Sequence, residues 1–349
     1  MLIFYILLLL LPLWGCKVAG KKFFVEESFS KSVTDSIKGI FIWLVFFSHF
    51  ASYVQYTSKI DVLGHKISIV LGQLIVACFL FYSGYGVCEA IKRKGTSYVR
   101  SIPKNRIAKT LLHFDIAVLL FLIIQLCLGN TYSFSRIALS LIGWEAVGNS
   151  NWYIFVILAL YLITWIAFTC AKNNLIQSGI FVTFLTFALI GFLYLTRWSW
   201  WYDTALCYVL GIWVSVFKDK FLSLITKSNF IWLICGFASI GLFGLLFLYR
   251  FPNYSKLNLI FSLLSAPAFC LVITVFLTKV KISNKLLVFS GQYLFEIYIL
   301  QRIPMILLKE WGIADMNLYL YFLLCLAATI ALSFAFRFTI KKVDALVFS

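Results

Sequence analysis

Long apolar runs recur along the chain and are separated by short polar segments. A helix needs about 20 apolar residues to cross a bilayer. Runs of roughly that length occupy residues 1–15, 38–57, 67–91, 110–128, 152–170, 177–195, 200–217, 229–249, 257–278, 287–308 and 317–338. This pattern predicts an all-α protein, a polytopic transmembrane helix bundle of about eleven spans forming one membrane domain.

Composition and charge agree with a membrane location. Of the 349 residues, 62% are hydrophobic and 12% are charged, which excludes a soluble domain. The net charge is +17, and 22 of the 30 Lys and Arg residues lie in alternate segments: 16–38, 92–109, 171–176, 218–228, 279–286 and 337–349. By the positive-inside rule these segments face the cytoplasm, so the C-terminus is inside and the N-terminus outside. No basic stripe is interleaved with exposed aromatic residues, so the expected partner is the lipid bilayer and not nucleic acid.

The first apolar segment and the cysteines do not require a functional explanation. Residues 1–15 lack a basic start, so a retained helix is favoured over a signal peptide that is removed. The nine cysteines form no Cys-x-x-Cys pair and no His/Cys cluster with zinc spacing. We therefore expect neither a metal site nor disulfides, and we expect the cysteines to act as small buried residues.

The first candidate site is His49, in the predicted span 38–57. Lys38 lies eleven residues earlier, on the same helix face and about 16 Å away along the axis. This spacing places the imidazole near mid-depth, where ionisable groups are costly and commonly functional. Asp35 is a neighbour of Lys38 at the helix entry. An imidazole is suited to proton transfer near neutral pH, although a polar contact between two helices is the structural alternative.

A second candidate is a stripe of cations. Arg106, Lys109 and His113 are spaced by three and four residues, so they share one helix face that leads from the most basic loop into the membrane. Such a stripe suits the phosphates of a nucleotide or of coenzyme A. Anchoring to anionic lipid is the alternative.

A third candidate lies in segment 291–302. Glu296 falls within a predicted span and needs a partner, which could be His49 or Arg302 of another helix. Tyr298 shares a face with Gln301 and Arg302. A structural polar clamp is the alternative.

Two weaker signals complete the set. Ser83-Gly-Tyr85 places small residues where helices can approach closely or a chain-like ligand can pass. Trp152 and Tyr153 at an outer helix start fit an aromatic belt or a surface that stacks on a sugar. The aromatic run near residues 198–203 has the same two interpretations.

Taken in order, these elements resemble the acyltransferase-3 family of integral-membrane acyltransferases. The family's Asp-x-x-Arg-Gly helix entry and following histidine are matched by Asp35-Ser-Ile-Lys38-Gly39 and His49. Its later elements are matched by Ser83-Gly-Tyr85, Arg106-Ile-Ala-Lys109, Trp152-Tyr153 and the segment from Gly291 through Tyr298 to Gln301. Lysine replaces arginine at 38 and 109, which keeps the charge but loses the bidentate fork. Gln301 stands where the family often has a histidine.

The resemblance implies residues 32–340 as an acyltransferase-like membrane domain, preceded by an extra helix and cytoplasmic linker over 1–31 and followed by a cytoplasmic tail over 341–349. It implies O-acylation of a cell-surface or exported carbohydrate at the bacterial cytoplasmic membrane. The co-substrate that the resemblance implies is acyl-coenzyme A, and the family suggests acetyl-coenzyme A in particular. No tightly bound cofactor is expected.

The residue roles follow from the same resemblance. His49 is the base or a transient acyl carrier, oriented by Glu296 or Asp35. Donor or acceptor binding is expected from Lys38, Arg106, Lys109, His113, Ser83, Tyr85, Trp152, Tyr298 and Gln301. A proton-coupled transporter or flippase of a glycan-related substrate is the competing class, because intramembrane charges fit it too.

Overall fold

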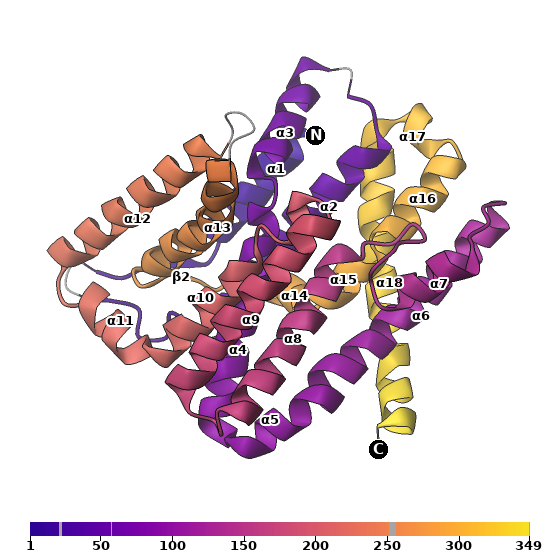
Figure 1. Cartoon of the computed structure of the whole chain (residues 1–349). Helices are drawn as coiled ribbons and strands as arrows, with labels where there is room; N and C mark the ends of the chain where they lie inside the picture. Colours follow the sequence, from indigo (N-terminus) through magenta and orange to yellow (C-terminus); the bar gives the residue numbers. More distant parts are fainter. Residues whose placement is uncertain (21–22, 57, 251–255, 349) are drawn as a thin grey trace.

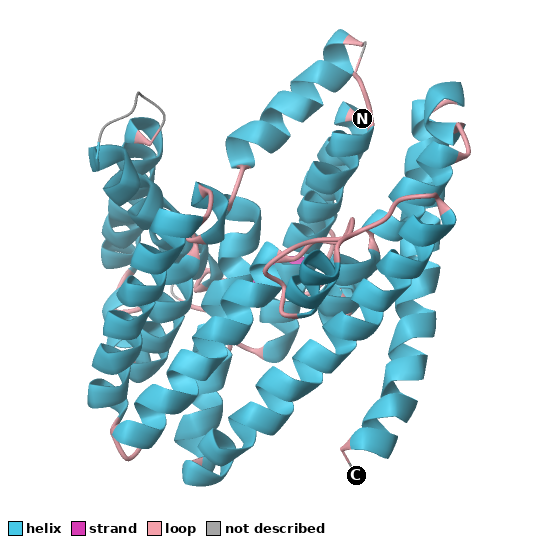
Figure 2. Cartoon of the chain, turned by 45° about the vertical axis from the view of Figure 1, so that its right-hand side comes forward, coloured by secondary structure: helices cyan, strands magenta, loops and turns pink. Residues whose placement is uncertain are grey.

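The computed structural model describes residues 1–20, 23–56, 58–250 and 256–348. Nearly all of the described chain is helical, and the long helices run roughly side by side with short loops at their two ends (Figures 1 and 2). Within these residues, eight helical stretches are long and apolar enough to cross a membrane: Lys31–Tyr53, Asp61–Lys94, Thr96–Cys127, Trp152–Cys170, Leu175–Thr196, Asn229–Tyr249, Asn258–Leu277 and Leu318–Val347. The prediction of an all-α polytopic bundle is confirmed.

Three of the predicted spans, 1–15, 200–217 and 287–308, are not among these eight stretches. Residues 1–15 form α1 (Leu2–Leu10) and a 3₁₀ turn (Leu11–Leu13), followed by strand β1 (Cys16–Val18), which pairs antiparallel with β2 (Val280–Ile282). Residues 200–217 contain α10 (Ala205–Val216). Residues 287–308 divide into α14 (Lys285–Gln292), α15 (Leu294–Leu300) and α16 (Arg302–Glu310). Pro304 explains the last break, because it has no N–H for the carbonyl of Leu300.

The helix that carries His49 is displaced from its predicted position. Helix α2 covers Lys31–Phe50 and is followed by a 3₁₀ turn at Ala51–Tyr53. His49 therefore lies in the last turn of this helix and not near its middle. The predicted span 67–91 is likewise two helices, α3 (Lys59–Leu71) and α4 (Leu74–Lys94). Gly72 joins them with φ +45°, a conformation that glycine adopts at little cost.

The remaining elements complete the bundle. Helix α5 (Thr96–Ile102) continues through a π-helical turn (Pro103–Ala108) into α6 (Lys109–Cys127), which crosses the view of Figure 1 diagonally. The other helices are α7 (Phe134–Leu141), α8 (Trp152–Cys170), α9 (Leu175–Thr196), α11 (Lys218–Ile225), α12 (Asn229–Tyr249), α13 (Lys256–Leu277), α17 (Ile313–Met316) and α18 (Leu318–Val347).

Glycine allows the central helices to touch backbone to backbone. A methyl group added at Gly39 of α2 would overlap the Leu287 carbonyl of α14, and one at Gly291 would overlap the backbone of α2. Gly84 of α4 and Gly211 of α10 meet the opposite helix in the same way. Close approach through small residues is a principal source of helix association in membranes. These two contacts fix α2 and α4, the helices that carry most of the site.

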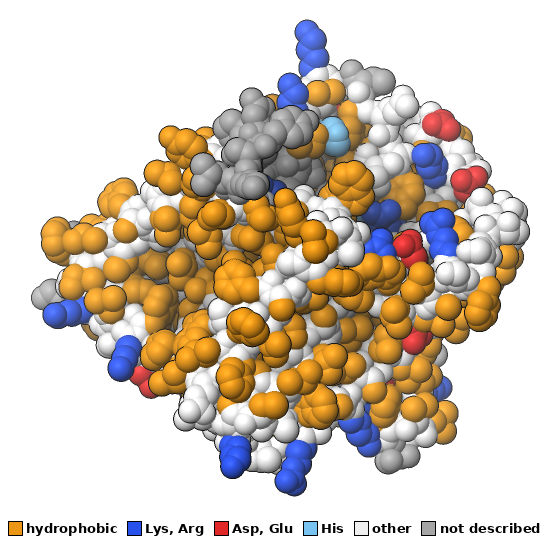
Figure 3. Space-filling view, viewed as in Figure 1, with side chains coloured by type: hydrophobic (Ala, Val, Ile, Leu, Met, Phe, Trp, Pro, Cys, Tyr) orange, Lys and Arg blue, Asp and Glu red, His pale blue; other side chains and the backbone are white. Residues whose placement is uncertain are grey.

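The outer surface is apolar. Figure 3 shows hydrophobic side chains across the middle of one face, with charged side chains mostly near its margins. Helix α12 packs on α13 at one side of the bundle, and its Phe230, Phe237 and Leu248 are among the exposed large apolar residues. An apolar waist between charged margins is what a bilayer requires.

Candidate functional site

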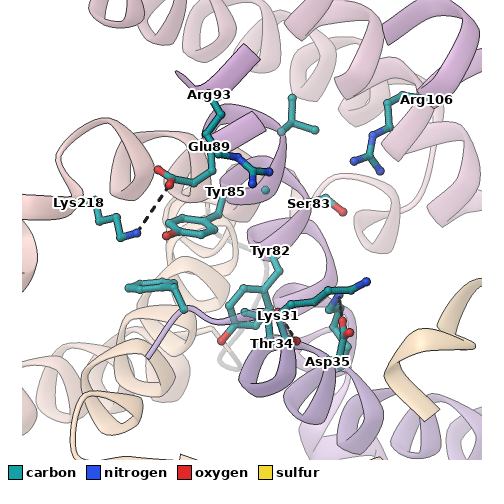
Figure 4. A pocket seen from close by; sticks show the side chains of 14 residues that line it. Lys31, Thr34, Asp35, Tyr82, Ser83, Tyr85, Glu89, Arg93, Arg106 and Lys218 are labelled. Atoms are coloured by element: carbon teal, nitrogen blue, oxygen red, sulfur yellow. Dashed lines mark hydrogen bonds and ion pairs between the residues drawn. The ribbon is translucent and has the colours of Figure 1, made fainter. Parts of the chain in front are cut away.

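A cavity of about 520 Å³ opens at the start of α2 and the end of α4, and we call it the cationic cavity. Figure 4 shows its charged and polar side chains converging from several helices. It is lined by Phe29, Lys31, Thr34, Asp35, Lys38, Tyr82, Ser83, Tyr85, Gly86, Val87, Glu89, Arg93, Arg106 and Lys218. Five of these side chains are basic and two are acidic. All five cations belong to segments predicted to face the cytoplasm, so the lining favours an anionic ligand from that side.

The two carboxylates of this cavity are neutralised by lysines. Asp35, only 2% exposed, accepts a hydrogen bond from Lys38 at 2.7 Å, while its Oδ2 atom has no hydrogen-bond partner among the described residues. Glu89 is paired with Lys92 at 2.8 Å and with Lys218 at 3.7 Å. Asp35 lies fourteen residues before His49 in one helix, or about 21 Å along the axis. Asp35 is therefore placed to hold Lys38 and not to orient the imidazole.

Arg106 links the cationic cavity to a second one. Arg106 and Ser83 also line a cavity of about 320 Å³, which we call the middle cavity. The guanidinium donates to the Tyr98 hydroxyl at 3.0 Å and lies over the Tyr161 ring at 5.9 Å. The remaining lining residues of the middle cavity are Thr110, His113, Tyr153, Ile154, Ile157, Tyr161, Leu294, Phe295, Glu296 and Arg337. A ligand at Arg106 can therefore reach both spaces.

The predicted cation stripe is divided between two environments. Arg106 and His113 line the middle cavity, but Lys109 is directed to the end of α18, where it lies 3.8 Å from Asp344. His113 also contacts Asp344, at 2.8 Å. The π-helical turn just before Lys109 changes the angular register of the helix. Spacing by three and four therefore does not place all three side chains in one cavity.

Glu296 has a partner that its spacing did not predict. Arg337 of α18 donates to both of its carboxylate oxygens, at 2.6 and 2.7 Å, and its guanidinium lies 3.5 Å from the centre of the Tyr293 ring. Arg302 instead donates to the Ser150 hydroxyl at 3.0 Å. The expected pairing of Glu296 with His49 or Arg302 is therefore wrong, and this carboxylate forms a bidentate ion pair in the middle cavity.

His49 lines a third cavity, of about 210 Å³, at the opposite end of α2. We call it the histidine cavity. Its walls are formed by Val45, Ser48, His49, Ala51, His65, Ser68, Ile69, Gly72, Gln73, Ile75, Val76, Trp152 and Tyr298. The Nδ1 atom of His49 is buried and has no hydrogen-bond partner in the described structure. An unpaired buried imidazole beside a polar space has free capacity to bind or to accept a proton.

Two tyrosines lie between the middle cavity and the histidine cavity. Tyr153 lines the former and Tyr298 the latter, and their ring centroids are 5.3 Å apart. The Tyr298 ring is in turn 6.1 Å from the His49 ring. The Tyr298 hydroxyl is buried without a hydrogen-bond partner in the described structure. The two tyrosine rings thus connect the middle cavity, which Arg106 also lines, to the imidazole of His49.

Some of the remaining predicted residues line a cavity, and others contact only neighbouring residues of the chain. Tyr85 lines the cationic cavity and stacks on Phe29 at 4.5 Å, and Trp152 lines the histidine cavity. Gln301 is fully buried, and its side-chain amide donates to the main-chain carbonyl of Tyr298 at 3.3 Å. The aromatic run near residues 198–203 has a structural role in part, because the guanidinium of Arg197 lies over the rings of both Trp144 and Trp201.

Sequence reasoning missed two site residues. His65 lies in what reads as an outer loop, and the kink at Gly72 brings α3 over the histidine cavity. Arg337 lies at a predicted helix end, with no sequence signal that pairs it with Glu296. The described residues hold no group of three or more His, Cys, Asp or Glu side chains suited to a metal ion.

A comparison with family models agrees with this arrangement. The model of the acyltransferase-3 family, described as an acyltransferase domain, matches residues 34–338. Comparisons with curated proteins and with solved structures find no match. The match covers most of the chain and includes every residue given for the three cavities except Phe29 and Lys31 of the cationic cavity. The chain therefore belongs to the acyltransferase-3 family, a family of membrane acyltransferases.

Proposed function

We propose that the protein transfers an acyl group, acetyl in the simplest case, from cytosolic acyl-coenzyme A to a hydroxyl of a cell-surface or exported carbohydrate. The observation that carries this proposal is the arrangement of three cavities from a cationic opening to a buried imidazole. The cationic and middle cavities share Ser83 and Arg106, and the tyrosine pair connects the middle cavity to His49. A thioester from one side and an alcohol from the other can meet along this line.

The cationic cavity is suited to the phosphates of coenzyme A. Its volume of about 520 Å³ falls in the range of small-molecule sites. Lys38 and Arg106 face it from two helices, and their charges are only partly offset by Asp35 and Glu89. Charge-assisted bonds to phosphate are among the stronger polar contacts available to a protein. The middle cavity, beyond Arg106, then accommodates the acyl end of the donor.

His49 is the group proposed to act on the acceptor. Its imidazole takes the proton of the attacking hydroxyl while the hydroxyl oxygen bonds to the thioester carbonyl carbon. The C–S bond then breaks, and the imidazolium returns the proton to the departing thiolate. An acyl-imidazole that forms first and then passes the acyl group to the hydroxyl gives the same products. In either route, Tyr298 positions the ring through their contact.

The proposal is tested with membranes from cells that express the chain or lack it. The membranes are incubated with radiolabelled acetyl-coenzyme A, and the label in purified surface polysaccharide is counted. We expect label to appear only where the chain is present, and to fall by about 10²–10⁴-fold with His49→Ala, the usual contribution of a general base. Lys66→Ala changes an exposed residue of α3 and serves as the control. Unlabelled polysaccharide from wild-type membranes, together with substrate uptake by sealed vesicles, would instead indicate a transporter.

A further inference from the structure

The histidine cavity contains a second imidazole that the reaction as described above does not use. His65 lies on α3, and His49 lies on α2, so the two rings reach one space from different helices. The Nδ1 atoms of both rings are buried and lack hydrogen-bond partners in the described structure. Buried polar atoms are nearly always paired, so two unpaired imidazole nitrogens beside one small cavity leave hydrogen-bonding capacity unused there.

The surroundings of His65 keep it in this position. Its ring packs on Tyr56 with centroids 5.2 Å apart. Helix α3 rests against α1, where a methyl group at Gly64 would lie 3.3 Å from the Tyr5 ring. Tyr5 in turn packs on Phe47 of α2, at 4.3 Å. Helix α3 is thus supported by α1 and α2, and the packing of the His65 ring on Tyr56 places it beside the cavity.

The other walls of the cavity suit a sugar. Ser48, Ser68 and Gln73 offer hydroxyl and amide groups, and Trp152 offers an aromatic ring. The histidine cavity differs in charge from the cationic cavity, because none of the described residues that line it is Lys, Arg, Asp or Glu. A neutral polar cavity with an aromatic wall favours a neutral, hydroxyl-rich ligand over a phosphate.

We propose that His65 is a binding residue of the acceptor site, where its imidazole accepts a hydrogen bond from a sugar hydroxyl next to the one that His49 acts on. The acceptor class is then a carbohydrate with two neighbouring free hydroxyls, one of which is acylated. This assignment rests on the proposed function, because it takes the histidine cavity as the place of the acceptor.

The first test uses ethoxyformylation of the three histidines by diethyl pyrocarbonate, read by mass spectrometry of the full-length protein in nanodiscs. The probes are unacylated polysaccharide from a strain that lacks the chain, and acetyl-coenzyme A. We expect polysaccharide to slow modification of His65 and His49, and acetyl-coenzyme A to slow that of His113 in the middle cavity. Modification of His65 at an unchanged rate with polysaccharide would overturn the proposal, even if the protein is an active acyltransferase.

The second test separates binding from folding. His65→Ala is expected to raise KM for the polysaccharide by about tenfold, the value of one good hydrogen bond, while KM for acetyl-coenzyme A stays unchanged. His65→Gln retains a side-chain acceptor and is expected to recover part of the loss. Lys66→Ala, next to it on α3, controls for the helix itself. Equal changes in both KM values, or loss of the folded protein with His65→Ala but normal kinetics with His65→Gln, would contradict a role in acceptor binding.

The two proposals fail in different ways. If membranes that contain the wild-type chain leave the polysaccharide unlabelled, the proposed function is wrong whatever His65 does. If His49→Ala is inactive and polysaccharide still leaves His65 unprotected, only the acceptor assignment is wrong.

Discussion

Tyr153 and Tyr298 pack with ring centroids 5.3 Å apart, and each ring lines a different cavity. One ring faces the space that Arg106 enters, and the other lies 6.1 Å from the imidazole of His49. The pair is therefore the partition between the side proposed for the donor and the side proposed for the acceptor. A partition of aromatic rings excludes water while leaving a short path for a reactive group.

Removing this partition should expose the thioester to water. We expect Tyr298→Ala to raise hydrolysis of acetyl-coenzyme A in the absence of acceptor by about tenfold and to lower transfer to carbohydrate. Tyr298→Phe keeps the ring and is expected to show neither effect. Release of free coenzyme A, measured with a thiol reagent, checks the first result. A Phe variant that leaks as much as the Ala variant would assign the effect to the hydroxyl and not to the ring.

Arg106 should act on the donor alone. We expect Arg106→Ala to raise KM for acetyl-coenzyme A by about 10–100-fold, the range for a lost charge-assisted hydrogen bond. Arg106→Lys should recover only part of this, because lysine lacks the planar fork. Lys220→Ala removes an exposed cation from the same predicted cytoplasmic side and is the control. Steady-state kinetics at two salt concentrations check the result, and an unchanged KM for the donor would contradict it.

The Glu296–Arg337 ion pair should contribute to stability. Its side chains are 12% and 25% exposed, so solvent screening reduces the cost of breaking it below that of a fully buried pair. We expect Glu296→Gln to destabilise the protein by about 1–3 kcal/mol, since it leaves the guanidinium of Arg337 without its carboxylate partner. The double variant with Arg337→Gln should recover part of this loss. Thermal unfolding in detergent measures both, and additive losses would show that the two residues are not coupled.

The glycine contact between α4 and α10 should tolerate no added methyl group. Gly84→Ala places a Cβ atom against the Tyr208 backbone, and we expect a loss of about 1–3 kcal/mol, as for other overpacked sites. Gly86→Ala, two residues later in the same helix, meets nothing within 4 Å and should leave stability nearly unchanged. Thermal unfolding midpoints of the two variants compare them directly. Equal midpoints would mean that the helices can separate without cost.

The fold class was predictable because each apolar run is long and the basic residues alternate between sides. The division of one predicted span into α14, α15 and α16 was not predictable, because the hydropathy average extends across the break before Pro304. His49 could be singled out because an ionisable residue within an apolar run is conspicuous, and Arg106 because of its spacing to Lys109 and His113. His65 could not be identified from the sequence, because its place beside the cavity depends on the kink at Gly72 between α3 and α4.

The second source of error in the sequence predictions was the pairing of side chains, because interaction partners can lie far apart in the sequence. Glu296 and Arg337 are 41 residues apart, and no local spacing links them. Lys109 was assigned to the same face as Arg106 on the assumption of a regular α-helix, and the π-helical turn before it removes that assumption. Both errors concern which side chains meet in the folded chain.

The central claim is that the imidazole of His49 acts on the acceptor while the cationic cavity holds the donor. The most direct test measures acetyl-coenzyme A binding and acetyl transfer with the same purified His49→Ala protein in nanodiscs. The account predicts a dissociation constant for the donor close to that of the wild type, together with transfer reduced by at least about 100-fold. Transfer at the wild-type rate by a variant that binds the donor normally would contradict it.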